Sequence, residues 1–477
     1  MKKKSIIFLL ILGIIAGYLI LRGYPEKVTL EINGEEVVLK QSDKENEINL
    51  TTLNSIHDIK VNVKAYGKLM LSINNYKISK YKENNLGKIV IGDNKKLNVS
   101  VKFKNGKTKK YTINTLPSSF PEYETTNNGD TFNGNYYMTT YSPDEASSYI
   151  FALNTDGNVI YYKQVPGFCS QFRKETSKDG DIRYVYTAQD KSSGSELNME
   201  DLHGKFIIMN EEFEIIDEAT YISSDKNDNT YTIFEYLDDG HYFITSSNKQ
   251  KVNNVPGYEE VTLTQNNLQE VKNGKVVFEW RSEDYPELYQ HVSELQKLNL
   301  EESNDYLHFN MIKVDPKDNN ILVSFRNISA IIKINRKTGE IMWTLGGKKD
   351  DFKMSKKQKF AYQHSIYFNE DGSMTIFDNG DNRVNLGIKN ESKVVTLKLN
   401  EELKKVESYK SYRLKEVYSM AMGSVQTMDL EHEIYLISYG SGMFANGPVA
   451  LIDFANNKTL FSFDLKNNKI MFSTEKE

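Results

Sequence analysis

The sequence predicts an all-β fold, and three features support this prediction. Tyr, a residue that favours strands, occurs 30 times in 477 residues, whereas Pro occurs only 9 times. Short apolar runs bounded by turn residues make up most of the chain. From about Tyr136 onward, a pair of apolar strands joined by an acidic or Gly-containing turn recurs at intervals of roughly 60 residues. Such a recurrence predicts a β-propeller, which is a ring of small antiparallel sheets.

Length and charge set limits on what the protein does. A chain of 477 residues is long enough for two or three domains or for one large repeat fold. The formal net charge is −5 and the pI is about 6.0, so the chain has no electrostatic footprint for nucleic acid. Lysines and acidic residues are interspersed along the sequence, which indicates a solvated surface.

The N-terminus has the pattern of a targeting segment. Met1-Lys2-Lys3-Lys4 precedes the apolar run Ile6–Leu21, which Arg22 closes. This run is intermediate in length between a signal-peptide core and a full membrane span. No small-x-small cleavage site is visible before Arg22, so we expect residues 1–26 to remain as a cell-membrane anchor with the rest of the chain outside the cytoplasm. Cleavage, which would give a secreted protein, is the alternative.

Residues 27–121 predict a small Ig-like β-sandwich. Its seven strand candidates are Val28–Ile32, Glu36–Leu39, Ile59–Val63, Leu69–Ile73, Lys88–Ile91, Leu97–Phe103 and Lys110–Ile113. Asn33-Gly34, Gly92-Asp93-Asn94 and Asn105-Gly106 supply turns. No catalytic pattern is visible here, which suggests a spacer or docking module. Pro117–Pro121 ends the domain as a stiff linker.

Residues 122–477 predict a six-bladed propeller. Five repeats begin near Phe172, Thr232, His308, His364 and Gly423, and a sixth begins near Tyr136. Aromatic-bearing outer strands contain Tyr161, Trp280 and Trp343. The longer interval before His308 holds Pro286–Leu300, where Leu288, Val292, Leu295 and Leu298 recur at helical spacing and predict a helix over one end of the propeller.

The stretch Asp305–Gly347 predicts four consecutive strands, which form one blade. Alternation would place His308 and Asn310 on one face of the first strand. The antiparallel register would place Arg326 or Asn327 opposite His308. An imidazole, an amide and a guanidinium together suit the binding of an oxyanion. The structural alternative is a hydrogen-bonded cluster at the rim of the propeller.

His364 occupies the equivalent position at the start of the next blade, and innermost strands of a propeller line its channel. Asp378 or Asn379 would lie near His364 in register and determine its tautomer, although the segment Asp378–Asn382 also suits a plain turn. A neutral imidazole can attack sulfur or phosphorus while Arg326, His308 and Asn310 stabilise the oxygens. We expect activity to fall as the pH drops through the pKa of the nucleophile.

Two other chemistries receive weaker support. His308 and His364 suit a metal, but no carboxylate or third His falls on an equivalent blade start, and Arg326 would repel a cation. Cys169 is the only cysteine, so an intrachain disulfide is excluded. Its apolar neighbourhood predicts a small core residue, and no local signature marks it as a nucleophile paired with a His.

These motifs resemble those of the bacterial aryl sulfate sulfotransferases, which use phenolic sulfates rather than a nucleotide sulfate as donor. The resemblance extends from Thr115-Leu116-Pro117 to about Gly440. It is strongest over Asp305–Gly347, over Gln363-His364 with Phe377-Asp378-Asn379-Gly380, and over Met422–Gln426. The resemblance implies a six-bladed propeller with an N-terminal β-sandwich, in the periplasm or outside the cell.

The resemblance also implies a reaction. A sulfuryl group would pass from an aryl sulfate to a phenolic acceptor by ping-pong transfer through a sulfohistidine at His364, with no metal or nucleotide cofactor. His308, Asn310 and Arg326 match sulfuryl-binding residues, and Ser424 falls where the family often has a small hydroxyl residue. The chain departs from the family at Thr232, where relatives have a histidine. Thr can hydrogen-bond a sulfuryl oxygen but cannot be protonated to assist a leaving phenolate.

A different class of function fits the same residues. A catalytically idle propeller would bind a sulfated or carbohydrate ligand, or a surface partner. Thr232 favours this alternative, whereas the intact set His308, Asn310, Arg326 and His364 favours an enzyme. The sequence gives no prediction of the oligomeric state.

Overall fold

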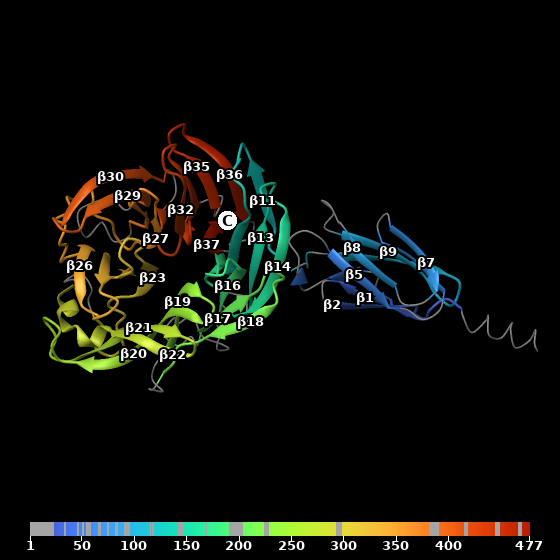
Figure 1. The fold of residues 1–477 in the computed structure, drawn as a ribbon, viewed down its shortest axis with the longest axis horizontal. Coiled ribbons are helices and arrows are strands. Elements are labelled where there is room, and N and C mark those ends of the chain that lie inside the picture. Colours follow the sequence, from blue (N-terminus) through green and yellow to red (C-terminus); the bar gives the residue numbers. More distant parts are fainter. Residues whose placement is uncertain are drawn as a thin grey trace, which may run out of the picture. The chain divides into compact units, whose positions relative to one another are not determined.

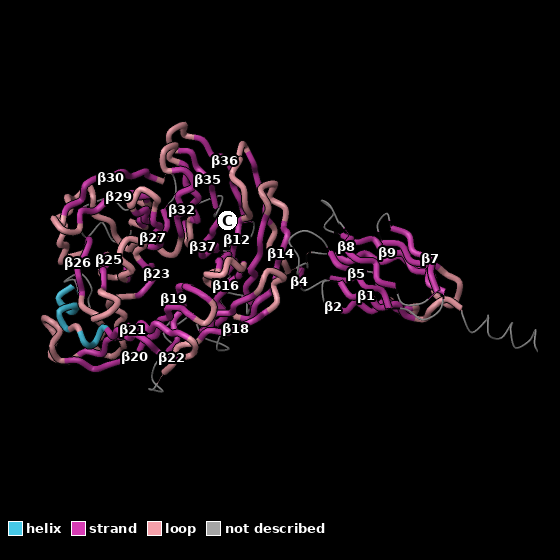
Figure 2. Tube along the Cα trace, viewed as in Figure 1, coloured by secondary structure: helices cyan, strands magenta, loops and turns pink. Residues whose placement is uncertain are grey.

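The computed structural model describes residues 23–477, apart from gaps at 33–34, 45–46, 50–51, 54–58, 65–67, 74–75, 82–83, 90–95, 115, 117–118, 142–146, 168, 190–203, 224–228, 292–297, 381–390, 415–417, 444–448 and 466–469. The chain divides into two compact units. The first ends at Phe120 and includes Ile160–Lys163, and the second holds the remainder from Pro121. Strands dominate both units, as Figure 2 shows, which confirms the all-β prediction.

The first unit contains two sheets, with strand orders β2-β1-β5-β8 and β3-β10-β9-β6-β7. The strands of this unit are β1 (Lys27–Ile32), β2 (Glu35–Lys40), β3 (Glu47–Asn49), β4 (Thr52–Leu53), β5 (Ile59–Lys64), β6 (Lys68–Ile73), β7 (Tyr76–Tyr81), β8 (Asn84–Ile89), β9 (Lys96–Lys102) and β10 (Thr108–Asn114). Val28, Leu30 and Ile32 alternate along β1 and are all buried, so this strand turns one apolar face away from water. All seven predicted strands have counterparts, whereas β3, β4 and β7 were not predicted.

The predicted N-terminal anchor falls almost wholly on residues 1–22, which lie outside the described residues. Within the described part of the chain, no helix is long and apolar enough to cross a membrane. The turn predicted at Gly92-Asp93-Asn94 also lies outside the described residues.

The second unit is built from sheets that follow one another around a ring, as Figure 1 shows. Its described strands are β11 (Tyr123–Asn127), β12 (Tyr136–Tyr141), β13 (Ser147–Leu153), β14 (Val159–Pro166), β15 (Phe172–Thr176), β16 (Ile182–Gln189), β17 (Gly204–Met209), β18 (Ile215–Ala219), β19 (Asn229–Asp238), β20 (His241–Val252), β21 (Val261–Lys272), β22 (Lys275–Arg281), β23 (Phe309–Val314), β24 (Ile321–Phe325), β25 (Ala330–Ile334), β26 (Ile341–Gly346), β27 (His364–Phe368), β28 (Met374–Asp378), β29 (Lys393–Asn400), β30 (Lys405–Arg413), β31 (Tyr418–Ser419), β32 (Ser424–Asp429), β33 (Ile434–Ser438), β34 (Gly442–Met443), β35 (Val449–Asp453), β36 (Lys458–Leu465) and β37 (Ile470–Lys476).

Within these residues, four sheets are simple runs of consecutive strands: β15 to β18, β19 to β22, β23 to β26 and β27 to β30. The remaining two large sheets have the orders β37-β12-β13-β14 and β11-β36-β35-β33-β32, and β31 pairs with β34. The C-terminal strand β37 therefore lies inside β12, and β11 lies outside β36. Local patterns did not predict this closure, because it pairs residues that are hundreds of positions apart.

The predicted repeat starts coincide with the first strands of the sheets. Phe172 and His364 begin β15 and β27, Thr232 lies in β19, and His308 directly precedes β23. Figure 1 shows β19, β23, β27, β32 and β37 on the inner side of the ring, with β18, β22, β26 and β30 on the outer side. The first strands therefore line the centre, as the repeat pattern predicted.

The hydrophobic core is divided into layers between neighbouring sheets. Ile321, Val323 and Phe325 of β24 belong to a cluster shared with residues of β19 to β22. Leu322, from the other face of the same strand, packs with Ile366 and with residues of β28 and β29. Because both faces of β24 are buried, the strand reads as a continuous apolar run rather than an alternating one.

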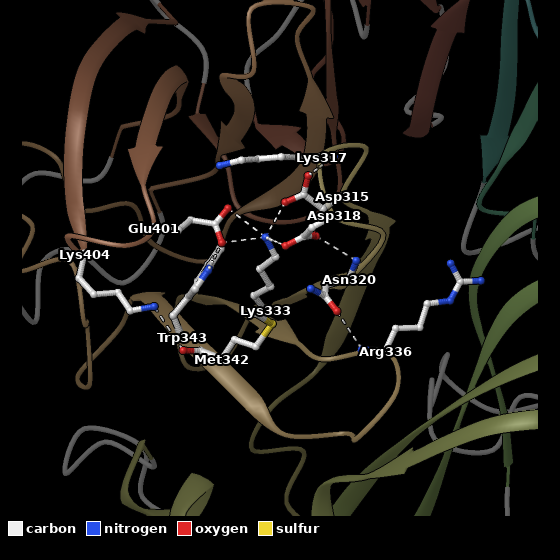
Figure 3. A network of polar contacts seen from close by, with 10 residues as sticks. All are labelled: Asp315, Lys317, Asp318, Asn320, Lys333, Arg336, Met342, Trp343, Glu401 and Lys404. Carbon is white, nitrogen blue, oxygen red and sulfur yellow. Dashed lines mark hydrogen bonds and ion pairs between the residues drawn. The ribbon is translucent and has the colours of Figure 1, made fainter.

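One buried lysine joins two of these sheets, as Figure 3 shows. Lys333 lies on β25, is fully buried, and its Nζ lies 2.7 Å from carboxylate oxygens of Asp315, Asp318 and Glu401. Glu401 follows β29 in the neighbouring sheet and also accepts a hydrogen bond from Trp343 Nε1 at 2.8 Å. The three carboxylates hold the pKa of Lys333 above its usual value despite burial, which acts in the opposite direction.

The helix predicted over Pro286–Leu300 is described only as the 3-10 helix η3 (Pro286–His291), preceded by η2 (Ser282–Asp284). Leu288 is buried and Leu298 packs on the same cluster, while residues 292–297 lie outside the described residues.

Cys169 is fully buried, and burial raises the pKa of its thiol to about 12, in agreement with a core residue.

Candidate active site

His364 is held by its own hairpin in a single tautomer. Its Nδ1 lies 2.8 Å from Asn379 Oδ1. The other end of that amide, Nδ2, donates to the carbonyls of Ser419 and Met422 at 3.2 and 2.9 Å, so Oδ1 must be the atom that faces the imidazole. An amide oxygen only accepts, and therefore Nδ1 of His364 carries the proton. This confirms the predicted orienting contact and assigns it to Asn379.

The second ring nitrogen of His364 consequently holds the lone pair. Its Nε2 accepts a hydrogen bond from the backbone N–H of Met422 at 3.2 Å. Asp378, the other predicted orienting residue, instead accepts the N–H groups of Ala361 and Gly380 at 3.0 Å. Asp378 therefore shapes the loop, and the Nε2 lone pair of His364 is the nucleophilic atom that the site offers.

The electrostatic surroundings keep His364 neutral. Burial and, next in size, the nearby guanidinium of Arg326 lower the pKa of His364 to about 3. His308 acts in the same direction, whereas the hydrogen bond to Asn379 acts against the shift. The imidazole is therefore unprotonated across the physiological range, which is the state a nucleophile requires.

His308 directly precedes β23 and is hydrogen-bonded to Asp305, which the sequence analysis did not single out. Asp305 Oδ2 lies 2.5 Å from His308 Nδ1, and Asp305 Oδ1 accepts the backbone N–H of His308 at 3.0 Å. His308 has a left-handed backbone with φ of 58°. An Asp three residues before a His in a loop is the local signal for such a two-point contact.

Arg326 stands opposite His308, as the predicted register required. Its backbone N–H donates to the carbonyl of His308 at 3.0 Å. Its guanidinium carbon lies 4.3 Å from the ring centroid of Tyr362, and Nη2 donates to the carbonyl of Met420 at 3.2 Å. These contacts hold the cation beside His364, whose pKa it lowers.

A bulge interrupts the alternation from which a common face of His308 and Asn310 was predicted. His308 precedes the strand, and the register of β23 on β24 shifts between Phe309 and Met311, so Asn310 is the extra residue of a β-bulge. Alternation does not apply across a bulge. Asn310 reaches the site because its Nδ2 donates to the carbonyl of Gln363, directly before His364. Its Oδ1 is buried with no hydrogen-bond partner among the described residues.

The same irregularity occurs on β27, where the register shifts between His364 and Ile366. Four non-glycine residues at the site have left-handed backbones: His308, Tyr362, Ser365 and Met422, with φ between 54° and 62°. Such conformations cost of order 1 kcal/mol each or more and are concentrated at functional sites. The bulges and the strained residues turn side chains of β23 and β27 toward the centre of the ring.

A cavity of about 150 Å³ lies at the centre of the ring, lined by residues of β15, β23, β27, β32 and β37. It brings together His364, Asn310 and Ser424 from the predicted set. The hydroxyl of Ser424 donates to the carbonyl of Thr474 and accepts the N–H of the same residue, both at 3.2 Å, so it joins β32 to β37. Thr232 lies in β19, and its side chain is outside the described part of the structure.

Charged side chains that the sequence did not reveal occupy another part of this cavity. Arg173 pairs with Glu175 at 2.5 Å, and Lys313 pairs with Glu235 at 3.0 Å. Burial raises the pKa of Glu175 to about 7, and burial also raises the pKa of Glu475. These residues come from β15, β19, β23 and β37, which only the closed ring brings together. In the described residues, no group of three or more His, Cys, Asp or Glu is arranged to hold a metal ion.

Comparison with known proteins identifies one family. The arylsulfotransferase (ASST) family matches residues 121–475, which is well over half of the chain. No protein of curated function matches the sequence.

Three solved structures show weak similarity. A Bacteroides caccae protein of unknown function is 12% identical, with coverage of 72% of this chain and 98% of that chain and a TM-score of 0.40. Virginiamycin B lyase from Staphylococcus aureus is 13% identical, with coverage of 73% and 98% and a TM-score of 0.34. The Cps50 (Swd1) β-propeller domain of Myceliophteria thermophila is 8% identical, with coverage of 71% and 87% and a TM-score of 0.37. Similarities of this strength carry no argument about fold or activity.

Proposed function

The chain belongs to the arylsulfotransferase family, and from this membership we propose that it moves a sulfuryl group from a phenolic sulfate to a phenolic acceptor through a sulfohistidine at His364. Family membership supports sulfotransferase activity in general. The observation that carries the finer proposal is the state of His364, a neutral ring with its proton on Nδ1 and its lone pair on Nε2.

The first half-reaction follows from that tautomer. The Nε2 lone pair gives up the hydrogen bond from the Met422 N–H and attacks the sulfur. The bond between sulfur and the aryl oxygen breaks, and its electron pair remains on the departing oxygen. The imidazole becomes cationic once the N–S bond forms, and the Nδ1–H bond to Asn379 stabilises that charge. In the second half-reaction an acceptor phenol attacks the sulfur, and the electron pair of the N–S bond returns to Nε2.

Charge on the sulfuryl oxygens requires donors that are already in place. The guanidinium of Arg326 stacks on Tyr362, and the carboxamide of Asn310 has one N–H held by Gln363 and a second one for the substrate. Such preorganised donors stabilise developing charge at low reorganisation cost. We assign substrate binding to Arg326, Asn310 and His308, with Ser424 and Thr232 as further members of the predicted set.

The setting of the enzyme is part of the proposal. We infer a six-bladed propeller over residues 122–477, an Ig-like sandwich over residues 27–121, and a signal anchor over residues 1–26 that places the catalytic domain outside the cytoplasm. The lysines before the apolar run Ile6–Leu21 support the anchor. Aryl sulfates and phenols are the small-molecule partners.

The test measures the covalent intermediate directly. Purified protein is incubated with 4-nitrophenyl sulfate, with and without phenol, and examined by intact mass. We expect acceptor-dependent turnover and an adduct of one sulfuryl group. Both should disappear in His364→Ala and persist in His432→Ala, because His432 lies in an exposed turn. Full turnover by His364→Ala contradicts the mechanism, and binding of donors without any adduct or turnover identifies a binding protein instead.

A further inference from the structure

We propose that Asp305 and His308 form the proton-transfer pair of this site, with His308 as acid and base and Asp305 as its positioning residue. This inference rests on the proposed function and extends it. It assigns His308 a role beyond binding the sulfuryl group, and it supplies a proton donor to a chain that has Thr232 in place of a histidine.

Asp305 contacts His308 at two points, the backbone N–H and the imidazole ring. Asp305 holds the backbone N–H of His308 with one carboxylate oxygen at 3.0 Å and the ring Nδ1 with the other at 2.5 Å. The side chains are 19% and 24% exposed, so the pair is partly shielded from water. A carboxylate accepts, and therefore Nδ1 of His308 carries a proton.

The two ring nitrogens of His308 differ in their contacts. Its Nε2 makes no hydrogen bond within the described part of the chain, whereas both ring nitrogens of His364 are engaged. His308 is also close enough for its charge to act on His364. Arg326 cannot give up its proton, and the amide of Asn310 is not an acid. Of the three residues His308, Arg326 and Asn310, His308 is therefore the one that can both donate and accept a proton.

The proton balance is complete without a further reactant. As Nε2 of His364 attacks the sulfur and the aryl oxygen leaves with its electron pair, the Nε2 proton of His308 passes to that oxygen and phenol departs. His308 is then neutral, with its remaining proton on Nδ1 facing Asp305. The acceptor phenol gives its hydroxyl proton to Nε2 of His308 as its oxygen attacks the sulfur. The pair thus returns to its starting state after each turnover.

The test separates acid catalysis from a structural role by varying the leaving group. Single-turnover formation of the sulfated enzyme is measured for the wild type and Asp305→Asn with 4-nitrophenyl sulfate and with phenyl sulfate. A nitrophenolate leaves readily without a proton, whereas an unactivated phenolate needs one. We expect Asp305→Asn to lose on the order of tenfold or less with the nitrophenyl donor, and about 10²-fold or more with phenyl sulfate. His308→Gln, a second variant, should show the same additional loss with phenyl sulfate, beyond the loss of sulfuryl binding that is common to both donors.

The chain provides a matched control. Asp429 binds the backbone N–H and Nδ1 of His432 at 2.9 Å, which is the same three-residue arrangement in an exposed turn. Asp429→Asn should leave both donors unaffected. Equal loss with both donors in Asp305→Asn and His308→Gln overturns the proton-transfer role and leaves the sulfohistidine proposal standing. Absence of any sulfated wild-type enzyme overturns both proposals.

Discussion

Residues in strained conformations surround the reacting group. His308, Tyr362, Ser365 and Met422 all have positive φ, although none is a glycine. Tyr362 places its ring under Arg326, and Met422 directs its N–H at Nε2 of His364. The surrounding sheets hold these conformations in place, so the geometry of the site depends on a small number of backbone torsions.

Gly423 provides a test of this dependence at the scale of one residue. Its φ is 95°, and an added Cβ would lie 2.6 Å from the ring of Phe377 and 2.9 Å from the carbonyl of Ser438. Gly423→Ala should displace the neighbouring Met422, whose carbonyl accepts a hydrogen bond from Asn379 Nδ2 and so orients His364. We expect kcat/KM to fall at least about tenfold, since small misplacements of reacting groups are costly. Steady-state kinetics with a chromogenic aryl sulfate measure the effect.

Gly372→Ala is the control for backbone strain. Gly372 also has a positive φ, of 78°, in the turn between β27 and β28, but a Cβ there meets nothing within 4 Å. Both variants incur the cost of a left-handed alanine, which is about 1 kcal/mol. Equal kinetic losses in the two variants would show that strain alone, and not the position of Met422, accounts for the result.

At the scale of elements, neighbouring sheets are joined by apolar layers and by a few buried charges. The network around Lys333 links β25 to the loop after β29 through Glu401, and it also gathers Asp315 and Asp318 from the hairpin turn of β23 and β24 (Figure 3). One ammonium thus separates three carboxylates. Removal of the lysine would leave these partly buried carboxylates without a cation to balance their charge.

Lys333→Met is expected to destabilise the protein by about 3–5 kcal/mol, the usual cost of breaking a buried ion pair from one side. Urea denaturation followed by tryptophan fluorescence measures the change, because Trp343 donates to Glu401 within the network. Lys404→Met is the matched control, since Lys404 is only partly buried and no carboxylate contact is recorded for it among the described residues. Its Nζ donates to the carbonyl of Met342 at 3.4 Å and lies 5.9 Å from the ring centroid of Phe352. A loss below about 1 kcal/mol in Lys333→Met, the range of surface ion pairs, would contradict a structural role for the network.

At the scale of the whole molecule, both ends of the second unit close the ring. β37 pairs with β12 as the innermost strand of one sheet, and β11 pairs with β36 as the outermost strand of another. Lys476 of β37 forms a fully buried ion pair with Asp130 and lies 4.3 Å from the ring centroid of Tyr136. β37 also supplies the cavity residues Thr474 and Glu475, so closure and site are built by the same strand.

Buried neutral histidines make the stability of the molecule depend on pH. Burial, followed by the nearby Lys349, lowers the pKa of His291 to about 4, whereas an unfolded histidine titrates near 6.5. Between these values the unfolded chain binds the additional proton, so the contribution of His291 to stability decreases as the pH falls from about 6.5 to 4. Glu175, whose pKa is raised, has the opposite dependence, so only a comparison of variants isolates the histidine.

His291→Leu should therefore gain stability relative to the wild type as the pH is lowered through this window, by up to about 1.4 kcal/mol per pH unit. Urea denaturation at several pH values between 7.5 and 4.5 measures the difference. His432→Gln should change in the opposite sense and above this window, because its exposed ring pairs with Asp429 and has a raised pKa. The variant should lose stability relative to the wild type as the pH falls toward about 6.5, and the difference should then be constant at lower pH. A difference between His291→Leu and the wild type that is constant across the window would contradict the linkage.

The sequence by itself determined the strand content and the repeat starts. It also predicted that His308, Arg326 and His364 lie near one another. These features depend on local alternation, turns and hairpin register, which operate over a few residues. Asn379 followed from the same register, two residues past the partner of His364.

Only the tertiary structure decided the tautomer of His364, the role of Asp305 and the closure of the ring. The tautomer depends on the amide of Asn379. The carbonyls of Ser419 and Met422, which are 40 and 43 residues further along the chain, orient this amide. Bulges replaced the simple alternation expected for Asn310, since one extra residue reverses the faces of a strand. The cavity combines inner strands from sheets that no local pattern connects, and its chemistry therefore arises from packing.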